Sequence, residues 1–360
     1  MNYIETFKKS LLEQCDRAAE NALCATLRTA ALPLTNYKNV VDIPKKELSY
    51  YGLLPVDLYQ VQYKQALQKF YLEKHFLYDK ITSTYIPLSE IVVSSYHSPQ
   101  KYYAEIQNRI NTLSLEAKQK NLFPLFMTLT LPSEFHKMKE TKNGVLVKNP
   151  KYNGTSPKEA IKILTKKFSK LRHDRALKTI PKDKRIYFRV NEPHKDGTPH
   201  THILLFIPHE NVDAVMKAFT RLFRTKGHEG KANEIQKIIN TVKNATAYVM
   251  KYINKTLPLS KKSYLLPHEH YLNAWYSKHR VLRFSSSRTL APMSLFRLLR
   301  QTYSLHTLTQ RCKEQSFKVF KEIHSNKIVE IFDGDELVYL RNENYTMCNS
   351  AHLFRANKVA

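Results

Sequence analysis

The chain of 360 residues is long enough for two domains, or for one domain with large additions. Apolar residues make up 42% of it, which excludes a disordered protein. Its 58 Lys and Arg residues against 31 Asp and Glu give a net charge of +27, and a surplus of that size indicates a polyanionic partner, most commonly nucleic acid.

Four cysteines lie at opposite ends of the chain, and none forms a Cys-x-x-Cys pair: Cys15, Cys24, Cys312 and Cys348. This pattern disfavours a zinc ribbon or a disulfide framework and favours a reducing, cytoplasmic location. Without an apolar signal core or a run of 18 apolar residues, no membrane partner is expected. The chain has no P-loop motif, so any unwinding motor has to be another protein.

The first part of the chain, 1–115, is predicted to be a helical accessory region, with amphipathic helices over 57–79 and 101–120. The composition changes at Leu122. Residues 123–132 then alternate apolar and hydroxyl side chains, which predicts a strand.

A basic helix is expected next, followed by two strands that Asp196-Gly197 joins in a tight turn, and then by two helices. The expected bounds are 157–178 for the basic helix, 186–190 and 200–207 for the strands, and 212–223 and 235–257 for the helices. This order predicts an α+β domain over 116–290 with a central antiparallel sheet and flanking helices. Residues 291–360 are expected to form a small C-terminal appendage with short strands at 318–323, 327–332 and 336–340.

The second turn-linked strand carries the most informative residues, His200 and His202. Alternate strand residues point to the same face, so the two imidazoles can hold one metal ion together. Glu192 can supply a third, oxygen ligand, with His194 and Asp196 as rivals because the turn leaves their direction open. Imidazole with carboxylate suits Mg²⁺ or Mn²⁺ when water and phosphate oxygens complete the shell. The alternative is two partly exposed histidines on a sheet face.

Two phenols, Tyr248 and Tyr252, lie one turn apart on the last of these helices, with Lys251 and Lys255 beside them. The apolar stripe of this predicted helix lies elsewhere, at Ile235, Ile238, Ile239, Val242, Val249 and Ile253. A phenol with a pKa of about 10 is a poor nucleophile at neutral pH, and a nearby lysine ammonium favours the phenolate. The pair therefore predicts cleavage of a DNA strand with a 5′-phosphotyrosine product, although ordinary boundary aromatics are the alternative in a chain with 22 tyrosines.

Three segments match, in order and spacing, the motifs of the HUH endonucleases: Thr128-Leu-Thr130, His200-Thr-His202 and Tyr248-x-x-Lys251-Tyr252. The runs from Glu192 to His202 and from Tyr248 to Lys255 more closely resemble the replication gene A proteins of bacteriophages, which nick an origin to start rolling-circle replication. Ala274-Trp275 and the run from Arg280 to Phe284 resemble a later family segment. The resemblance covers about 120–290. Thr201 departs from it, where the pattern has a hydrophobic residue.

The resemblance implies an HUH-type sheet with His200, His202 and Glu192 as metal ligands and the two tyrosines as alternating nucleophiles. It implies origin DNA, single-stranded or supercoiled, as the substrate, and the host cytoplasm as the location if a phage encodes the chain. A host helicase and a DNA polymerase that extends the free 3′-OH are the expected partners. A two-tyrosine transposase or plasmid initiator, or a non-catalytic DNA-binding protein, are the alternatives.

Basic side chains are expected to provide the path of the DNA. The candidates are Lys166, Lys170, Arg172, Lys255, Arg280 and Arg283. A solvated charged face is the alternative for each cluster. Three aromatic residues either stack on single-stranded bases or pack in the core: Tyr271, Trp275 and Tyr276.

Overall fold

A computed structural model of the chain describes residues 50–141, 143–223, 234–237, 242–260, 265–322, 327–341 and 345–349. Contacts within the chain separate two compact units, one holding 54–97 and 345–349 and the other holding 50–53 and 98–341 of these residues. The expected division of the chain at 115 and 290 stays a prediction. Most of the expected accessory region, 1–49, lies outside the described residues.

The smaller unit combines one long helix with a three-stranded antiparallel sheet of order β13-β1-β2. Its elements are α3 (Pro55–Lys74), β1 (His75–Asp79), β2 (Thr84–Pro87), α4 (Leu88–Ile91) and β13 (Tyr345–Asn349). The helix expected over 57–79 is therefore wrong after Lys74. Residues 75–79 instead pair with a strand from the far end of the chain, a partner that local periodicity does not reveal.

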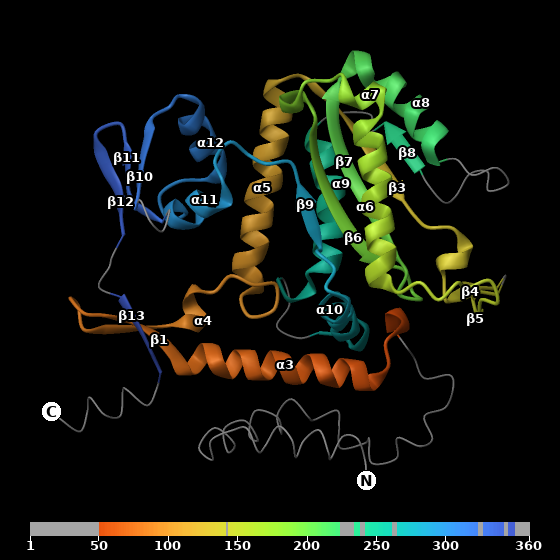
Figure 1. Cartoon of the computed structure of the whole chain (residues 1–360), viewed down its shortest axis with the longest axis horizontal. Coiled ribbons are helices and arrows are strands. Elements are labelled where there is room, and N and C mark those ends of the chain that lie inside the picture. Colours follow the sequence, from red (N-terminus) through yellow and green to blue (C-terminus); the bar gives the residue numbers. More distant parts are fainter. Residues whose placement is uncertain are drawn as a thin grey trace, which may run out of the picture. The chain divides into compact units, whose positions relative to one another are not determined.

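The larger unit is built on a five-stranded sheet of order β8-β3-β7-β6-β9 in which every adjacent pair is antiparallel (Figure 1). The strands are β3 (Leu122–Leu129), β6 (Ile186–Pro193), β7 (Pro199–Pro208), β8 (Glu234–Lys237) and β9 (Phe284–Ser286). A separate two-stranded ribbon joins β4 (Met138–Glu140) and β5 (Leu146–Lys148). The expected mixed α+β class with antiparallel sheets is confirmed.

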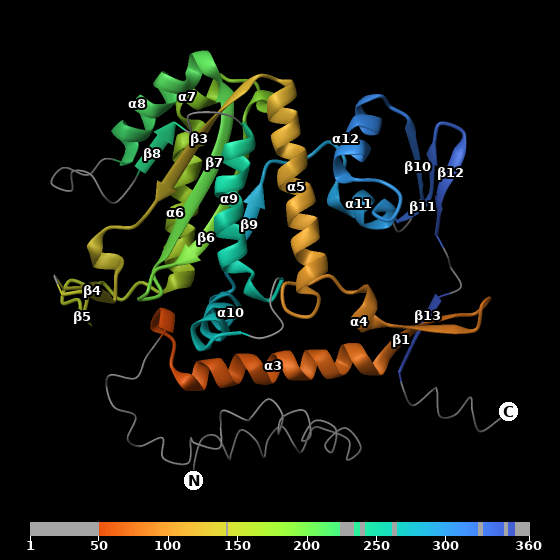
Figure 2. The same cartoon turned by 180° about the vertical axis from the view of Figure 1, so that it is seen from behind.

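Helices cover both faces of this sheet, as Figures 1 and 2 show from opposite sides. The longer ones are α5 (Pro99–Gln119), α6 (Pro157–His173), α8 (Val212–Phe223), α9 (Val242–Thr256) and α10 (Pro267–His279). The described residues of this unit also form the short α7 (Arg175–Lys178) and the 3-10 turns η2 (Tyr50–Gly52), η3 (Ser133–Phe135), η4 (Lys182–Lys184), η5 (His209–Asn211) and η6 (Pro258–Ser260).

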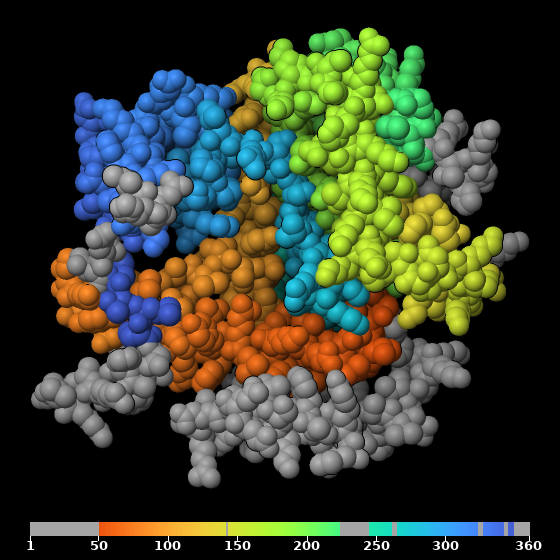
Figure 3. Space-filling view, in the orientation of Figure 1, coloured from red at the N-terminus to blue at the C-terminus, as the bar shows by residue number. Residues whose placement is uncertain are grey.

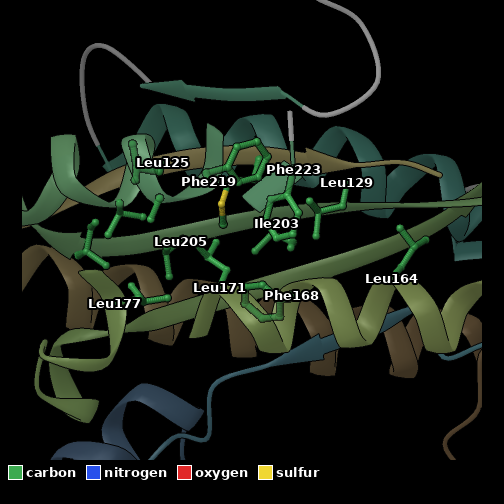
Figure 4. Packing of buried hydrophobic residues seen from close by; sticks show 14 of the residues in the cluster. Leu125, Leu129, Leu164, Phe168, Leu171, Leu177, Ile203, Leu205, Phe219 and Phe223 are labelled. Carbon is green, nitrogen blue, oxygen red and sulfur yellow. The ribbon is translucent and has the colours of Figure 1, made fainter. Parts of the chain in front are cut away.

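One face of the sheet packs against α6, α7 and α8. It is lined by odd-numbered side chains of β3 and β7, such as Leu125, Ile203 and Leu205, which meet Leu164 and Phe168 of α6 (Figure 4). Because strand side chains alternate, the even-numbered residues of the same strands face the other way. The basic helix expected over 157–178 is present but broken at Asp174, whose side chain accepts a hydrogen bond from the backbone of Ala176 and begins α7.

The opposite face packs against α5 and α9. Phe126, Leu204 and Phe206 of the sheet meet a buried stripe of α9 made by Ala245, Val249, Ile253 and the adjacent Leu257. His200 and His202 share this face with Leu204 and Phe206, since all four are even-numbered residues of β7. The sheet thus presents both histidines to the helix that carries the two tyrosines.

The helix expected over 235–257 is shorter than predicted. Residues 234–237 form β8, which pairs with β3, and α9 begins at Val242. Of its expected apolar stripe, Ile238 and Ile239 lie outside the described residues. The strands at 186–190 and 200–207 and the helix at 212–223 are confirmed.

The C-terminal segment of this unit combines α11 (Met293–Leu299) and α12 (Leu305–Lys313) with a sheet of order β10-β11-β12. The three strands, β10 (Phe317–Lys321), β11 (Ile328–Asp333) and β12 (Glu336–Leu340), confirm the three short strands expected there. Leu295, Leu308 and Ile331 form part of its own small core. Among the residues that the structure describes, no helix combines the length and apolar character that a membrane crossing requires.

Candidate active site

The hairpin of β6 and β7 brings Glu192 beside both histidines. Glu192 pairs in register with His200, so cross-strand neighbours on one face place its carboxylate next to the imidazoles. Its Oε2 lies 3.6 Å from His200 Nε2 and 3.8 Å from His202 Nε2. Within the described part of the chain, these three residues form the group whose potential ligand atoms converge, all within 4.8 Å of one another.

The chemistry of this group fits a divalent cation. Glu192 and His202 are buried, and three of the polar atoms here have no hydrogen-bond partner: Glu192 Oε1, His200 Nδ1 and His202 Nε2. Buried polar atoms of a folded protein are normally satisfied, so a cluster of orphaned nitrogen and oxygen atoms indicates a ligand. One carboxylate with two imidazoles is a donor set that Mg²⁺ or Mn²⁺ accepts when waters complete the shell.

Burial also keeps the imidazoles in the neutral form that binds a cation. It lowers the pKa of His202 to about 3 and that of His200 well below its usual range, and the Lys255 ammonium adds to both shifts. Thr128 Oγ1 on β3 lies 3.2 Å from His202 Nδ1. A proton on Nδ1 donated to Thr128 would leave Nε2 with a free lone pair toward Glu192.

The rival ligands named from the sequence lie on the turn that follows Glu192. Asp196 accepts hydrogen bonds from Thr198 and lies 3.2 Å from His136 Nδ1, so its carboxylate is already engaged. The His194 ring packs 4.1 Å from the His200 ring, and burial lowers its pKa to about 4. Neither belongs to the converging group, so the geometry favours Glu192 as the third ligand.

The two tyrosines lie at the edge of this group. Tyr252 packs against the His202 ring in a tilted arrangement, with centroids 4.0 Å apart, and its hydroxyl donates a 3.2 Å hydrogen bond to the Tyr248 hydroxyl. Tyr248 is the more open of the two, with 39% of its surface exposed. The structure therefore brings both phenols to the same face of the sheet as the histidines.

Two lysines of α9, Lys251 and Lys255, occupy different positions. Lys255 Nζ lies 2.9 Å from Glu192 Oε2 although its side chain is 62% exposed, so this residue, predicted to contact DNA, forms an ion pair with a proposed metal ligand. Burial raises the pKa of the Glu192 carboxyl, and the Lys255 ammonium acts against that rise. Lys251 is exposed on the same helix, one residue from Tyr252.

Phe126 is a site residue that the sequence analysis misses. It comes from β3 and lies under the two phenols and one histidine: its ring stacks 5.5 Å from Tyr252 and 5.6 Å from His202, and meets Tyr248 edge-on at 4.6 Å. In the sequence it is one apolar residue of an alternating strand, and only the pairing of β3 with β7 reveals its neighbours.

Phe126→Leu should lower the yield of any tyrosine–DNA adduct about tenfold, because both phenols lose the ring that fixes their rotamers. It should also cost about 1–2 kcal/mol of stability. The matched control is Phe188→Leu, a buried phenylalanine on the same sheet face that contacts Phe284. Adduct yield per folded molecule, measured beside urea unfolding, separates the effects. An equal loss in both variants would contradict a positioning role for Phe126.

Helix α5 supports the tyrosine helix from its other side. Ser114 Oγ lies 2.6 Å from Thr246 Oγ1, and the Tyr103 hydroxyl donates a 3.0 Å hydrogen bond to Asn254 Oδ1. The two hydrogen-bonded pairs lie about two helical turns apart on α9. Together they fix the axial position of α9 relative to α5.

The model of a protein family described as the bacteriophage replication gene A protein matches residues 26–258, which is more than half of the chain. The chain belongs to this family. The match includes β6, β7 and α9, and so contains every residue of the site described above.

Curated relatives of the family are similar over part of their length. The replication protein of Haemophilus phage HP1 is 35% identical over 181 residues, which is 48% of this chain and 21% of that protein. The replication gene A protein of Escherichia phage 186 is 33% identical over 181 residues, covering 48% and 25%. A probable replication endonuclease from a prophage-like region of Escherichia coli O6:H1 is 27% identical over 259 residues, covering 67% and 31%.

The chain thus spans between a fifth and a third of the length of these family members. No solved structure matches it. The expected HUH-type architecture of the sheet therefore stays a prediction, whereas the expected α+β class is confirmed.

The basic residues of α6 lie away from the site. Lys166, Lys170 and Arg172 are exposed, and α6, whose outer side forms part of the surface in Figure 3, covers the sheet face opposite the histidines. Lys167 of the same helix turns inward and donates to the Thr130 carbonyl. A DNA contact on α6 stays a prediction, and it would lie across the sheet from the phenols.

Arg283, also predicted to contact DNA, points into the fold. Its guanidinium donates to the Thr256 carbonyl at the end of α9 and to Asn273 Oδ1 of α10, and it lies 4.0 Å over the Tyr276 ring. This arrangement supports a structural role. The predicted base-stacking aromatics are likewise core residues, because Tyr271, Trp275 and Tyr276 are buried.

Arg283→Ala should lower the free energy of unfolding by about 3 kcal/mol, since it leaves buried acceptors without donors. Arg280→Ala is the matched control, three residues earlier and exposed, and should change stability by less than about 0.5 kcal/mol. Urea unfolding measures the stability of both variants, and binding of a labelled oligonucleotide by the folded proteins measures their affinity for DNA. A fall in DNA binding for Arg283→Ala at unchanged stability would contradict the structural role.

Proposed function

We propose that this chain nicks one strand of replication-origin DNA and holds the new 5′ end on a tyrosine. The observation that carries this proposal is the convergence of Glu192, His200 and His202 beside two tyrosines. Tyr252 packs against His202 and donates a hydrogen bond to Tyr248. Relatives named as probable replication endonucleases support it.

In the proposed step, the phenolic oxygen of one tyrosine attacks the phosphorus of the scissile phosphate. The bond from phosphorus to the 3′ oxygen breaks, the phenol proton passes to water, and Lys251 protonates the leaving oxygen. The products are a 5′-phosphotyrosine and a free 3′-OH. The phosphotyrosine retains the energy of the broken ester, so a later 3′-OH can reverse the step and seal the strand.

Glu192, His200 and His202 would hold the cation. The lowered pKa values of His200 and His202 keep both imidazoles neutral, which suits that role. Mg²⁺ or Mn²⁺ bound there supplies positive charge to the scissile phosphate. Phe126 and Thr128 fix the rings of the tyrosines and of His202, so the chain presents nucleophile and ligands already oriented.

The biological role proposed for this chemistry is the initiation of rolling-circle replication on single-stranded or supercoiled origin DNA. A host helicase would unwind the duplex and a host polymerase would extend the free 3′-OH. The net charge of +27 supports a nucleic-acid substrate.

Covalent capture tests the proposal directly. The protein is incubated with single-stranded fragments of its own genome in Mn²⁺, denatured, and analysed for a protein–DNA adduct whose peptide is sequenced by mass spectrometry. The expected result is an adduct on Tyr248 or Tyr252 that disappears in excess chelator. Tight DNA binding without any adduct would instead favour a non-catalytic DNA-binding protein, and adducts that form only at transposon ends would favour a transposase.

A further inference from the structure

A short segment that precedes α3 holds the turn of the metal-ligand hairpin. The strap, residues 50–53, lies against residues 194–198, which connect Glu192 to His200. The Tyr51 backbone N–H donates a 3.1 Å hydrogen bond to the Lys195 carbonyl, although Tyr51 has a φ of 55°, a conformation that costs a non-glycine residue energy. A strained residue that persists here shows that its surroundings determine the conformation.

Two glycines allow the strap and the turn to touch backbone to backbone. A Cβ on Gly197 would lie 2.2 Å from the Tyr51 carbonyl oxygen, and a Cβ on Gly52 would lie 2.7 Å from the Asp196 carbonyl oxygen. Both glycines also have positive φ, +88° and +69°. Each glycine faces the backbone of the other segment. A side chain at either position would therefore push the strap and the turn apart.

The strap and the turn both contact α10. Trp275 Nε1 donates a 2.9 Å hydrogen bond to the Gly197 carbonyl, and the Tyr50 ring packs 5.5 Å from Tyr271. Trp275 and Leu53 are fully buried. The turn is therefore held between the strap and a buried indole.

The turn held by this contact lies between two of the proposed ligands in the sequence. Glu192 and His200 form a register pair at the end of the hairpin, two residues from the turn on each side, so a shift of the turn changes their separation directly. We propose that the strap is a positioning element that sets the geometry of the cation site from a segment about 140 residues earlier in the sequence. The inference rests on the proposed function, because it assumes that these side chains bind a cation.

Four glycine-to-alanine variants of the full chain test the proposal. Gly52→Ala and Gly197→Ala push the strap from the turn. Gly154→Ala and Gly334→Ala are matched controls, because these glycines also have positive φ, +84° and +63°, but an added Cβ meets nothing within 4 Å. All four variants place an alanine at a positive φ and share the energetic cost of that conformation. The strap variants differ from the controls only by the clash of the new Cβ with the backbone of the other segment. The measurement is the Mn²⁺ dissociation constant by isothermal titration calorimetry, with circular dichroism as the check on folding.

The strap variants should bind Mn²⁺ about 10–100-fold more weakly than the controls, as expected when the support of metal ligands is disturbed. Their binding of a single-stranded oligonucleotide in chelator should be unchanged. Where a strap variant does not fold, Trp275→Phe decides, since it removes the N–H that holds the Gly197 carbonyl, together with part of the buried indole, and should weaken Mn²⁺ binding at least threefold in protein that circular dichroism shows to be folded. Folded variants that bind Mn²⁺ as tightly as the controls overturn the inference.

His202→Ala distinguishes the failure of the strap from that of the site. If the native chain binds Mn²⁺ and His202→Ala does not, the cation site stands and the strap variants judge the strap alone. If native and His202→Ala proteins bind Mn²⁺ equally, the site itself is misassigned and both proposals fall.

Discussion

Replacing His200 and His202 together by alanine should lower strand cleavage about 10³-fold or more while leaving DNA binding within about threefold of the native value. The reason is that the two imidazoles supply two of the three converging ligand atoms, and loss of the cation removes several kcal/mol of charge stabilisation from the transition state. DNA binding rests on phosphate contacts with basic side chains, which these substitutions leave in place. Cleavage of a labelled single strand and its anisotropy in chelator measure the two quantities.

His209→Ala is the matched control for this loss. His209 follows the same strand at its other end, is exposed, and packs edge-on against Phe123 rather than against the ligand group. Its variant should cleave at the native rate. The metal assignment would be refuted by a double histidine variant that cleaves normally, or by native protein that cleaves normally in excess chelator.

The second large effect concerns the two phenols. Tyr248→Phe and Tyr252→Phe should each still form an adduct, whereas the double variant should form none. The hydroxyls are 3.2 Å apart, so both can reach one phosphate position in succession. One would cleave the origin and stay on the 5′ end. When the origin is regenerated, the other would attack it, and the released 3′-OH would close the displaced strand into a circle.

Repeated rounds of replication distinguish a protein with one nucleophilic tyrosine from a protein with two. Each single variant should release few circles in an extended replication reaction, since the partner phenol needed for the second attack is missing. Tyr71→Phe, an exposed tyrosine of α3, serves as the control and should release circles at the native rate. If either single variant of the pair sustained many rounds of release, the alternation would be wrong and one phenol would be structural.

The hairpin with its histidines could be predicted from the sequence because all of the information is local. Alternation along the strand assigns His200 and His202 to one face, and Asp196-Gly197 marks the turn that folds Glu192 back toward them. The i, i+4 spacing similarly places Tyr248 and Tyr252 on one side of a helix. Thr201, between the two histidines, lies on the other face by the same alternation and donates to Asn191 Oδ1.

The residues that complete the site could not be predicted, since their roles depend on partners far away in the sequence. Phe126 and Thr128 reach His202 through the pairing of β3 with β7, and Lys255 reaches Glu192 because α9 packs on that face. A count of basic residues cannot distinguish Arg283, which serves the core, from Arg280, which is exposed. Ile235 is compatible with the apolar face of a helix and with a strand, so the sequence alone does not distinguish the two. Its pairing with β3 makes it part of a strand.

Helix α5 makes the unit that holds the proposed site depend on its C-terminal segment. Glu105 of α5 is buried, and Arg297 of α11, 192 residues later, holds its carboxylate with hydrogen bonds of 2.9–3.3 Å. A chain shortened to end near residue 290 would lose this ion pair and would also expose the side of α5 that α12 covers, and so would destabilise α5. Because α5 also fixes α9 through Ser114 and Tyr103, such a truncation would loosen the helix of the two phenols. The smallest fragment that retains cleavage should therefore extend past α11, well beyond the last residue that touches the site.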